Sequence, residues 1–165
     1  MCPSYFRIRV PLEEAIQRYA KWAKVPLPTD RQIIKSSRAH DAVIDERGHW
    51  RGKALFVSAL EDWTLFRDIS VGYCSVPGEL WLQFAGSDDL VFANYNDACC
   101  FGSLVVIEGG KLVREFLDYA DDPTENVNFG DLGPDFEPIE SWVDVAGIVD
   151  DDKLGFSSTG FLWVY

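Results

Sequence analysis

The feature that most constrains the fold is a pair of adjacent glycines, Gly109 and Gly110, between two β-rich runs, Ser103–Glu108 and Lys111–Asp118. Glycine adopts a positive φ without a Cβ clash, so a two-residue Gly-Gly link suits the type I′ or II′ turn of a β-hairpin. The hairpin register then predicts an opposite-charge pair beside the turn and apolar pairs on both faces. The expected pairs are Glu108 with Lys111, Ile107 with Leu112 and Val106 with Val113.

Apolar runs on either side of this hairpin predict further strands. They are Tyr5–Val10, Leu55–Leu60, Trp63–Ile69, Leu90–Tyr95 and Gly160–Tyr165. Apolar residues at helical spacing predict helices over 12–23 and 141–149 and a third that starts within 75–79 and ends before Gly86, although this third stretch also fits a strand. We therefore expect one α+β domain with a mainly antiparallel sheet of about five to seven strands and helices packed against it. The Gly-Gly hairpin and Leu90–Tyr95 are expected at the middle of that sheet.

The size of the chain suits a single domain, because 165 residues bury roughly two-thirds of their unfolded surface. No apolar run approaches the roughly 18 residues of a membrane span, and the N-terminal segment lacks the apolar stretch of a secretory signal. The cysteines have neither zinc-site spacing nor a disulfide pattern, so we expect inert, reduced thiols at Cys2, Cys74, Cys99 and Cys100. These features predict a cytoplasmic protein that has no membrane partner.

Charge is distributed unevenly along the chain, whose formal net charge is −12. Residues 1–53 hold 11 Lys and Arg against 6 Asp and Glu, whereas residues 54–165 hold 4 against 21. The single domain 1–165 thus has a basic strand–helix region, 1–53, and an acidic, sheet-rich body, 54–165. An acidic body repels phosphate backbones and attracts basic proteins, so we expect a basic protein partner and no nucleic acid. The alternative is that the acids serve only solubility.

The acids most available to a partner lie in a loop-like stretch, residues 121–138, and after the last helix. Long ordered loops are often functional, and Val127, Phe129, Leu132 and Phe136 offer apolar anchors that would order this one. Three successive Asp residues at the end of a helix oppose its dipole, and such local conflicts accompany functional sites. The candidate partner-binding residues are Asp121, Asp122, Glu125, Asp131, Asp135, Glu137, Asp150, Asp151 and Asp152.

Catalytic motifs are absent from the sequence. It has no GxxxxGK[ST] or GxGxxG loop for nucleotide phosphates, no HExxH and no GxSxG. The stretch from Arg31 to Lys53 carries both histidines, His40 and His49, without an acid–base partner at useful spacing, so we expect surface histidines in a short helix and a loop. We therefore assign no catalytic, cofactor-binding or metal-binding residue and expect no enzyme activity. A carboxylate pair such as glycosidases use is an open alternative.

A resemblance rests on four segments: GKALFVSALEDWTLFRDIS, DLVFANYNDACCFGSLVVIEGGKLVREF, DYADDPTENVNFG and ESWVDVAGIVDD. Their order before a final aromatic strand resembles that of small bacterial proteins encoded beside polymorphic toxins, which are thought to act as immunity proteins. The resemblance covers residues 52–165 and includes no catalytic motif. It implies a cytoplasmic, non-enzymatic inhibitor that binds a cognate toxin domain.

The charge pattern agrees with that implication. Toxins that act on nucleic acids or nucleotides present basic clefts, and an inhibitor can occupy such a cleft with carboxylates. We therefore predict an immunity protein that neutralises a toxin domain through an acidic surface. The other hypotheses are a general protein-interaction scaffold module and a carboxylate-based hydrolase.

Overall fold

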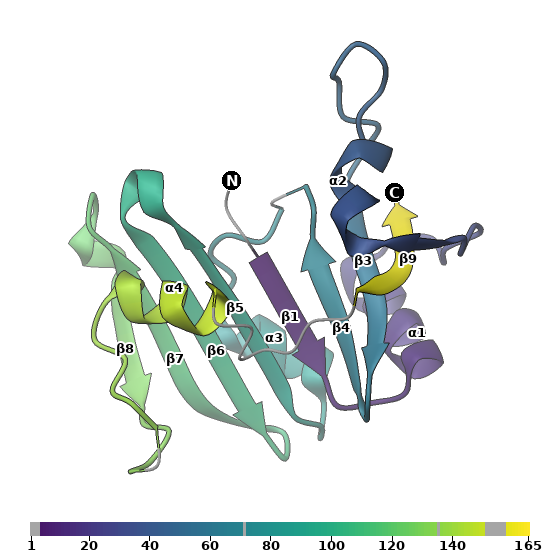
Figure 1. The fold of residues 1–165 in the computed structure, drawn as a ribbon. Coiled ribbons are helices and arrows are strands. Elements are labelled where there is room, and N and C mark those ends of the chain that lie inside the picture. The colour runs from purple at the N-terminus through teal and green to yellow at the C-terminus, as the bar shows by residue number, and fades with distance from the viewer. Residues whose placement is uncertain (1–3, 71, 135, 151–157) are drawn as a thin grey trace.

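The strand β1 (Ser4–Ile8) lies at the centre of the sheet, between β4 (Trp63–Asp68) and β5 (Leu90–Asn96) (Figure 1). The computed structural model describes residues 4–70, 72–134, 136–150 and 158–165. Over these residues it contains one nine-stranded sheet, in the order β2-β9-β3-β4-β1-β5-β6-β7-β8. All neighbouring strands are antiparallel, and helices cover both faces, so the predicted α+β fold is confirmed.

The remaining elements have the following bounds. The other strands are β2 (Ile33–Lys35), β3 (Ala54–Leu60), β6 (Phe101–Glu108), β7 (Lys111–Tyr119), β8 (Val127–Gly130) and β9 (Thr159–Val164). The helices are α1 (Leu12–Ala23), α2 (Ala39–Ala42), α3 (Gly78–Ala85) and α4 (Trp142–Asp150). Short 3₁₀ turns occur at η1 (Ser36–Arg38), η2 (Asp97–Cys99) and η3 (Pro123–Glu125). No helix in the described ranges is both long enough and apolar enough to cross a membrane.

The main core fills the space between the sheet and the helices α1 and α3. Alternation along β1 sends Phe6 and Ile8 into this core, where both are fully buried. Phe6 stacks on Phe66 of β4 with ring centroids 4.7 Å apart, and Trp81 of α3 stacks on Phe92 of β5 at the same distance. The N-terminal strand therefore joins the β3–β4 hairpin to the β5–β8 strands, which corrects the prediction that the Gly-Gly hairpin lies at the middle of the sheet.

Three tyrosine hydroxyls meet beside this core. Tyr19 of α1 hydrogen-bonds to Tyr73 at 2.5 Å and also to Tyr165. Burial raises the pKa of all three phenols, so each remains neutral and able to donate. The C-terminal residue is thereby tied to the first helix.

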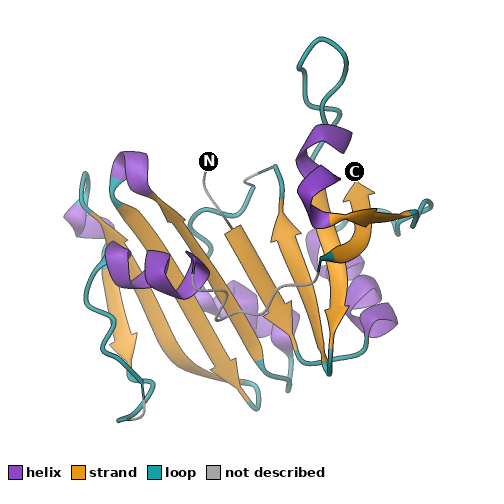
Figure 2. Ribbon diagram, viewed as in Figure 1, coloured by secondary structure: helices purple, strands orange, loops and turns teal. Residues whose placement is uncertain are grey.

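The opposite face carries α4 over β5–β7 and α2 at the β3–β9 end (Figure 2). α4 begins with a capping box, because the Asp144 carboxylate accepts hydrogen bonds from the backbone N–H of Ser141 at 2.8 Å and from its hydroxyl at 2.9 Å. Burial opposes ionisation of Asp144, but these bonds and one from the Glu140 N–H outweigh it and lower the pKa of that carboxyl. Val145 and Val149 then pack onto the sheet.

The Gly-Gly hairpin has the predicted turn, and part of the predicted register is wrong. Gly109 and Gly110 both have positive φ, 53° and 73°, as a type I′ turn requires. The pairs Glu108 with Lys111 and Ile107 with Leu112 are confirmed. Val106, however, pairs with Arg114, because a β-bulge inserts Val113 as an extra residue. The bulge moves Arg114 onto the α4 face of the sheet.

Other differences lie at the sheet edges. The structure adds two short edge strands that the sequence did not predict, β2 and β8. Phe129 and Phe136, predicted as anchors of the 121–138 loop, are 52% and 60% exposed. Cys99 and Cys100 lie at the η2 turn, and Cys74, which is exposed, Cys99 and Cys100 form no disulfide with one another.

Candidate functional site

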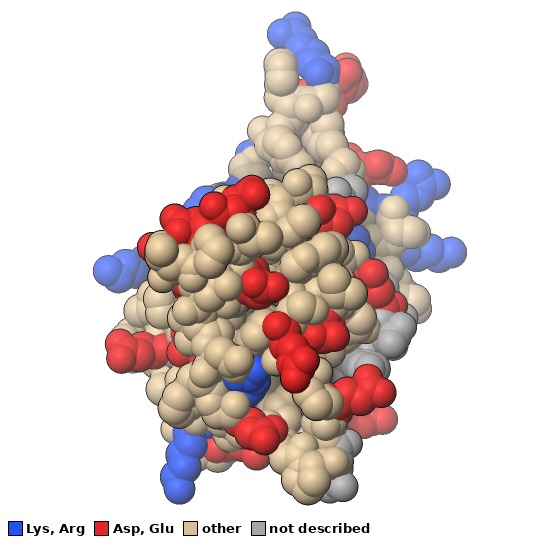
Figure 3. Space-filling view, turned by 90° about the vertical axis from the view of Figure 1, so that its left-hand side faces the viewer, with Lys and Arg blue, Asp and Glu red and all other residues tan. Residues whose placement is uncertain are grey.

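The acids predicted to bind a partner gather mostly at the β8 end of the sheet. Asp121, Asp122 and Glu125 follow β7 at η3, and Asp131 and Glu137 follow β8, all of them exposed. Figure 3 views this end and shows Asp and Glu side chains spread across it with few Lys or Arg among them. The predicted residues Asp135, Asp151 and Asp152 lie outside the described residues.

The charge balance of this end is strongly negative. Residues 90–150 carry 13 Asp and Glu against 2 Lys and Arg, namely Lys111 and Arg114. Arg114 is only 5% exposed, so it presents little cationic surface to a partner, although its charge acts on Asp131. The arginine ion pairs between described residues start from Arg9, Arg18 and Arg31, elsewhere in the molecule. Within the described ranges, none of the five loop acids forms an ion pair with Lys or Arg, so their carboxylates face solvent.

Arg114 organises the loop from the inside. Its Nη1 donates hydrogen bonds to the Asn128 Oδ1 at 2.7 Å and the Phe129 carbonyl at 2.9 Å, while Nη2 donates to the Ile139 carbonyl at 2.9 Å. Burial lowers the pKa of this guanidinium, and the charge of Asp131 opposes the shift. The sequence analysis missed this residue, because only the β-bulge aims it at the loop.

Two of the acids also have local structural roles. The Asp122 carboxylate accepts from the Thr124 N–H and hydroxyl and so begins η3, and Asp131 accepts from the Gly133 N–H at 3.0 Å. No described hydrogen bond engages the side chains of Asp121, Glu125 or Glu137. These three are therefore the acids whose replacement disturbs the loop least.

Asp150 is placed differently from the loop acids. It ends α4, and its carboxylate accepts from the Tyr95 hydroxyl, with its two oxygens 2.8 and 3.0 Å from that hydroxyl. This hydrogen bond, together with burial, raises the pKa of Tyr95 to about 12. Asp150 thus ties the helix to β5 on the α4 face of the sheet.

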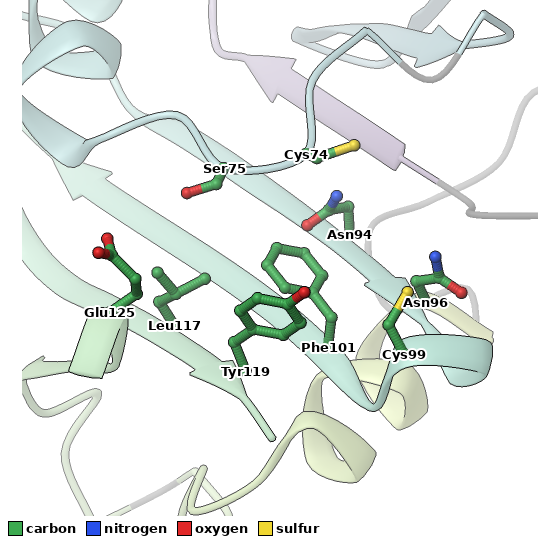
Figure 4. Close-up of a pocket in the computed structure, with 9 residues that line it drawn as sticks. All are labelled: Cys74, Ser75, Asn94, Asn96, Cys99, Phe101, Leu117, Tyr119 and Glu125. Atoms are coloured by element: carbon green, nitrogen blue, oxygen red, sulfur yellow. The ribbon is translucent and has the colours of Figure 1, made fainter. Parts of the chain in front are cut away.

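A pocket opens beside η3 on the other face, the one that carries α3. Its volume is about 370 Å³, and its walls are the ends of β5, β6 and β7 and the Cys74-Ser75 segment (Figure 4). Phe101, Leu117 and Tyr119 provide the apolar wall, and Glu125 lies at the rim. The ring centroids of Phe101 and Tyr119 are 5.9 Å apart in an edge-on arrangement. The pocket therefore joins an apolar surface to the acidic loop.

The short length of α3 explains why this pocket exists. α3 begins at Gly78, whose N–H donates to the Glu115 Oε1 of β7 at 2.8 Å. A Cβ at Gly78 would lie 2.8 Å from that carboxylate and 3.0 Å from the Leu112 side chain, so the approach is close. α3 therefore covers the first part of β7, and Leu117 and Tyr119 farther along the strand line the pocket instead.

The pocket also contains a buried acceptor without a partner. Asn94 is 1% exposed, and its Nδ2 donates to the Tyr73 carbonyl at 3.1 Å. Because a carbonyl oxygen can only accept, the Nδ2 and not the Oδ1 faces it; Ser4 donates its hydroxyl to the same carbonyl at 3.0 Å. The Asn94 Oδ1 has no hydrogen-bond donor in the described part of the chain. An unsatisfied buried acceptor costs about 1–3 kcal/mol, so this atom favours a ligand that donates a hydrogen bond.

The predicted surface histidines lie far from this site along the sheet. His40 belongs to α2, where its ring lies edge-on to Trp50 at 5.4 Å, and His49 lies in the following loop beside Asp45. No group of three His, Cys, Asp or Glu side chains that could hold a metal ion occurs within the described ranges. The β8 end offers an apolar pocket, a buried acceptor and carboxylates that have no Lys or Arg partner among the described residues.

Comparisons with protein-family models, with curated proteins and with solved structures give no match to this chain.

Proposed function

We propose that this protein is an immunity protein that binds a cognate bacterial toxin domain through the acidic β8 end and neutralises it. The observation that supports the proposal most is the surplus of exposed carboxylates on this end that form no ion pair with another described residue, together with the burial of Arg114. A surface of this kind attracts a basic cleft over long range and raises the rate of encounter. The resemblance of residues 52–165 to immunity proteins supplies the biological class.

Apolar contact surface complements the charge. Phe129 of β8 and Phe136 in the following loop are both more than half exposed, and the pocket beside η3 adds Leu117 and Tyr119. Aromatic side chains that become fully covered dominate the energy of protein interfaces, while the surrounding charges set specificity. The β8 end combines both properties over adjacent elements.

The first test is co-expression with the product of the adjacent gene. We expect the two chains to co-purify, and we expect this protein to restore growth of cells that express the toxin domain. If no neighbouring gene product co-purifies with this protein and none of them is neutralised by it in the growth test, the proposal is contradicted. Equal binding to several unrelated basic proteins would support the scaffold hypothesis instead.

The second test locates the surface. The double replacement Glu125→Lys and Glu137→Lys should weaken toxin binding by more than tenfold, or about 1.4 kcal/mol, because both carboxylates face the partner. The matched control, Asp41→Lys with Glu46→Lys, makes the same change of charge near α2 and should leave affinity within about threefold. Calorimetry measures both, and thermal melting checks that the fold is retained. Equal loss in the two variants would exclude the β8 end as the specific site.

A further inference from the structure

We infer that the pocket beside η3 receives an arginine side chain of the partner, an inference that rests on the proposed function and specifies one contact within it. The pocket has a volume of about 370 Å³, near the lower end of the roughly 300–1,000 Å³ of small-ligand sites. It therefore suits one long side chain better than a peptide segment.

The floor of the pocket needs a hydrogen-bond donor. The Nδ2 of Asn94 donates to the Tyr73 carbonyl, so a half-turn of the amide would lose this hydrogen bond and place two acceptors against each other. In Figure 4 the Oδ1 lies on the side of Asn94 that faces the Phe101 ring and the pocket. Among the described residues no donor reaches it, although Asn94 is 99% buried. A guanidinium N–H supplies the missing donor.

The rim of the pocket needs a cation. Glu125 lines it with a carboxylate that forms no ion pair with another described residue, and its side chain stands across the pocket from Ser75 (Figure 4). The surrounding surface carries further acids and repels an anionic ligand. A charged donor is therefore favoured over a neutral one.

The wall of the pocket distinguishes arginine from lysine. Phe101 and Tyr119 present aromatic surface, on which a planar guanidinium stacks and against which the methylene stem packs. Arginine also carries five N–H donors in a plane, so its head group can donate in several directions within the pocket. Lysine has one compact ammonium and no planar surface to stack on the two rings.

The experiment uses the isolated protein and two small probes of the same shape, the cation N-butylguanidinium and the neutral N-butylurea. Both are titrated against isotopically labelled protein while the amide signals are followed by NMR. We expect the cation to shift the Asn94 side-chain signal and its neighbours saturably, with a Kd on the order of 10 mM, and the neutral probe to bind at least about fivefold more weakly.

Two matched variants sharpen the test. Glu125→Gln, which removes the rim charge, should weaken binding of N-butylguanidinium at least about threefold, whereas Glu137→Gln, which removes the same charge outside the pocket, should not. Equal binding of the two probes, equal effects of the two variants, or no saturable shift at Asn94 would each overturn the inference.

The result is separable from that of the proposed function. If N-butylguanidinium binds but no toxin is neutralised, the inference of a guanidinium-binding pocket is supported and the immunity role is contradicted. Loss of toxin binding in the Glu125 and Glu137 double variant, without binding of the cation, supports the acidic interface and contradicts the pocket.

Discussion

Arg114 shows how one buried residue shapes a surface it does not reach. Its guanidinium satisfies the Asn128 side chain and the carbonyls of Phe129 and Ile139, so it joins β7, β8 and the loop that leads to α4. Five fixed donors suit this task, since carbonyls from separate segments converge on one planar group. The exposed acids are thereby held on an ordered backbone, while the guanidinium of Arg114 itself lies beneath the surface.

Tyr95 and Asp150 give a prediction at the same scale. The hydrogen bond to the Asp150 carboxylate raises the pKa of Tyr95 to about 12 from an ordinary value of 10.0. The neutral phenol therefore stabilises the fold fully below about pH 10, and that contribution is lost as the pH rises through about 12. Replacing Asp150→Asn should lower the pKa of Tyr95 toward 10, measured by NMR titration of labelled tyrosine.

A matched variant controls for general charge. Asp97 also raises the pKa of Tyr95, by a weaker and purely electrostatic effect, so Asp97→Asn should move that pKa less than Asp150→Asn does. The pairing of Tyr95 with Asp150 would be disproved by a Tyr95 pKa that is the same in the Asp150 variant and in the unmodified protein.

At the scale of elements, the β-bulge in β7 packs closely against Gly130, the last residue of β8. The bulge at Val113 shifts the register, and Gly130 of β8 pairs with Arg114 beside it. Gly130 has a φ of 75°, and a Cβ there would lie 1.9 Å from the Val113 carbonyl oxygen. The edge strand can therefore approach the bulge only with glycine at this position.

Alanine substitutions test this fit. Gly130→Ala should lower the free energy of unfolding by at least about 2 kcal/mol more than Gly133→Ala, because it adds a backbone clash to the cost of a left-handed residue. Gly133 is the matched control, since its φ is 88° and a Cβ there meets nothing within 4 Å. Urea unfolding measures the difference, and hydrogen exchange should show faster exchange in β8 of the Gly130 variant alone. Equal costs would show that the clash is relieved by movement of the edge strand.

The errors in predicting elements share one cause. The strands β2 and β8 are short and lie at the two edges of the sheet. Each pairs with a neighbouring strand on one side only. Both are mostly exposed, so their sequences lack the apolar alternation that identified the inner strands. The aromatic anchors predicted in the loop failed for a related reason, since Arg114 orders it through backbone carbonyls.

Across the whole molecule, the sheet separates the charges. Its order places β2 and the basic 31–53 region at one edge and β8 with the acidic loop at the other. The uneven charge along the chain thus becomes an uneven charge in space. The core carries no charge that would work against this separation at β1, because β1 joins the two halves of the sheet through the apolar side chains of Phe6 and Ile8.

The separation predicts how binding depends on salt. If the acidic end steers the toxin domain, the association rate should fall roughly tenfold between about 50 and 500 mM salt, while the dissociation rate changes much less. Stopped-flow mixing of the two proteins measures both rates. The Glu125→Lys, Glu137→Lys variant should show a shallower dependence, and an association rate that is insensitive to salt would rule out steering by this surface.

The sequence by itself determined the Gly-Gly turn, the inner strands, the helices α1 and α4, the α+β class and the surplus of acids, because these depend on local periodicity, turn chemistry and composition. Only the tertiary structure decided that β1 is the central strand and that Arg114 is buried under the acidic loop. It also decided that Asn94 lies on the floor of a pocket whose rim is Glu125. The physical reason is that strand order, and therefore which distant side chains meet, is set by packing of the whole core.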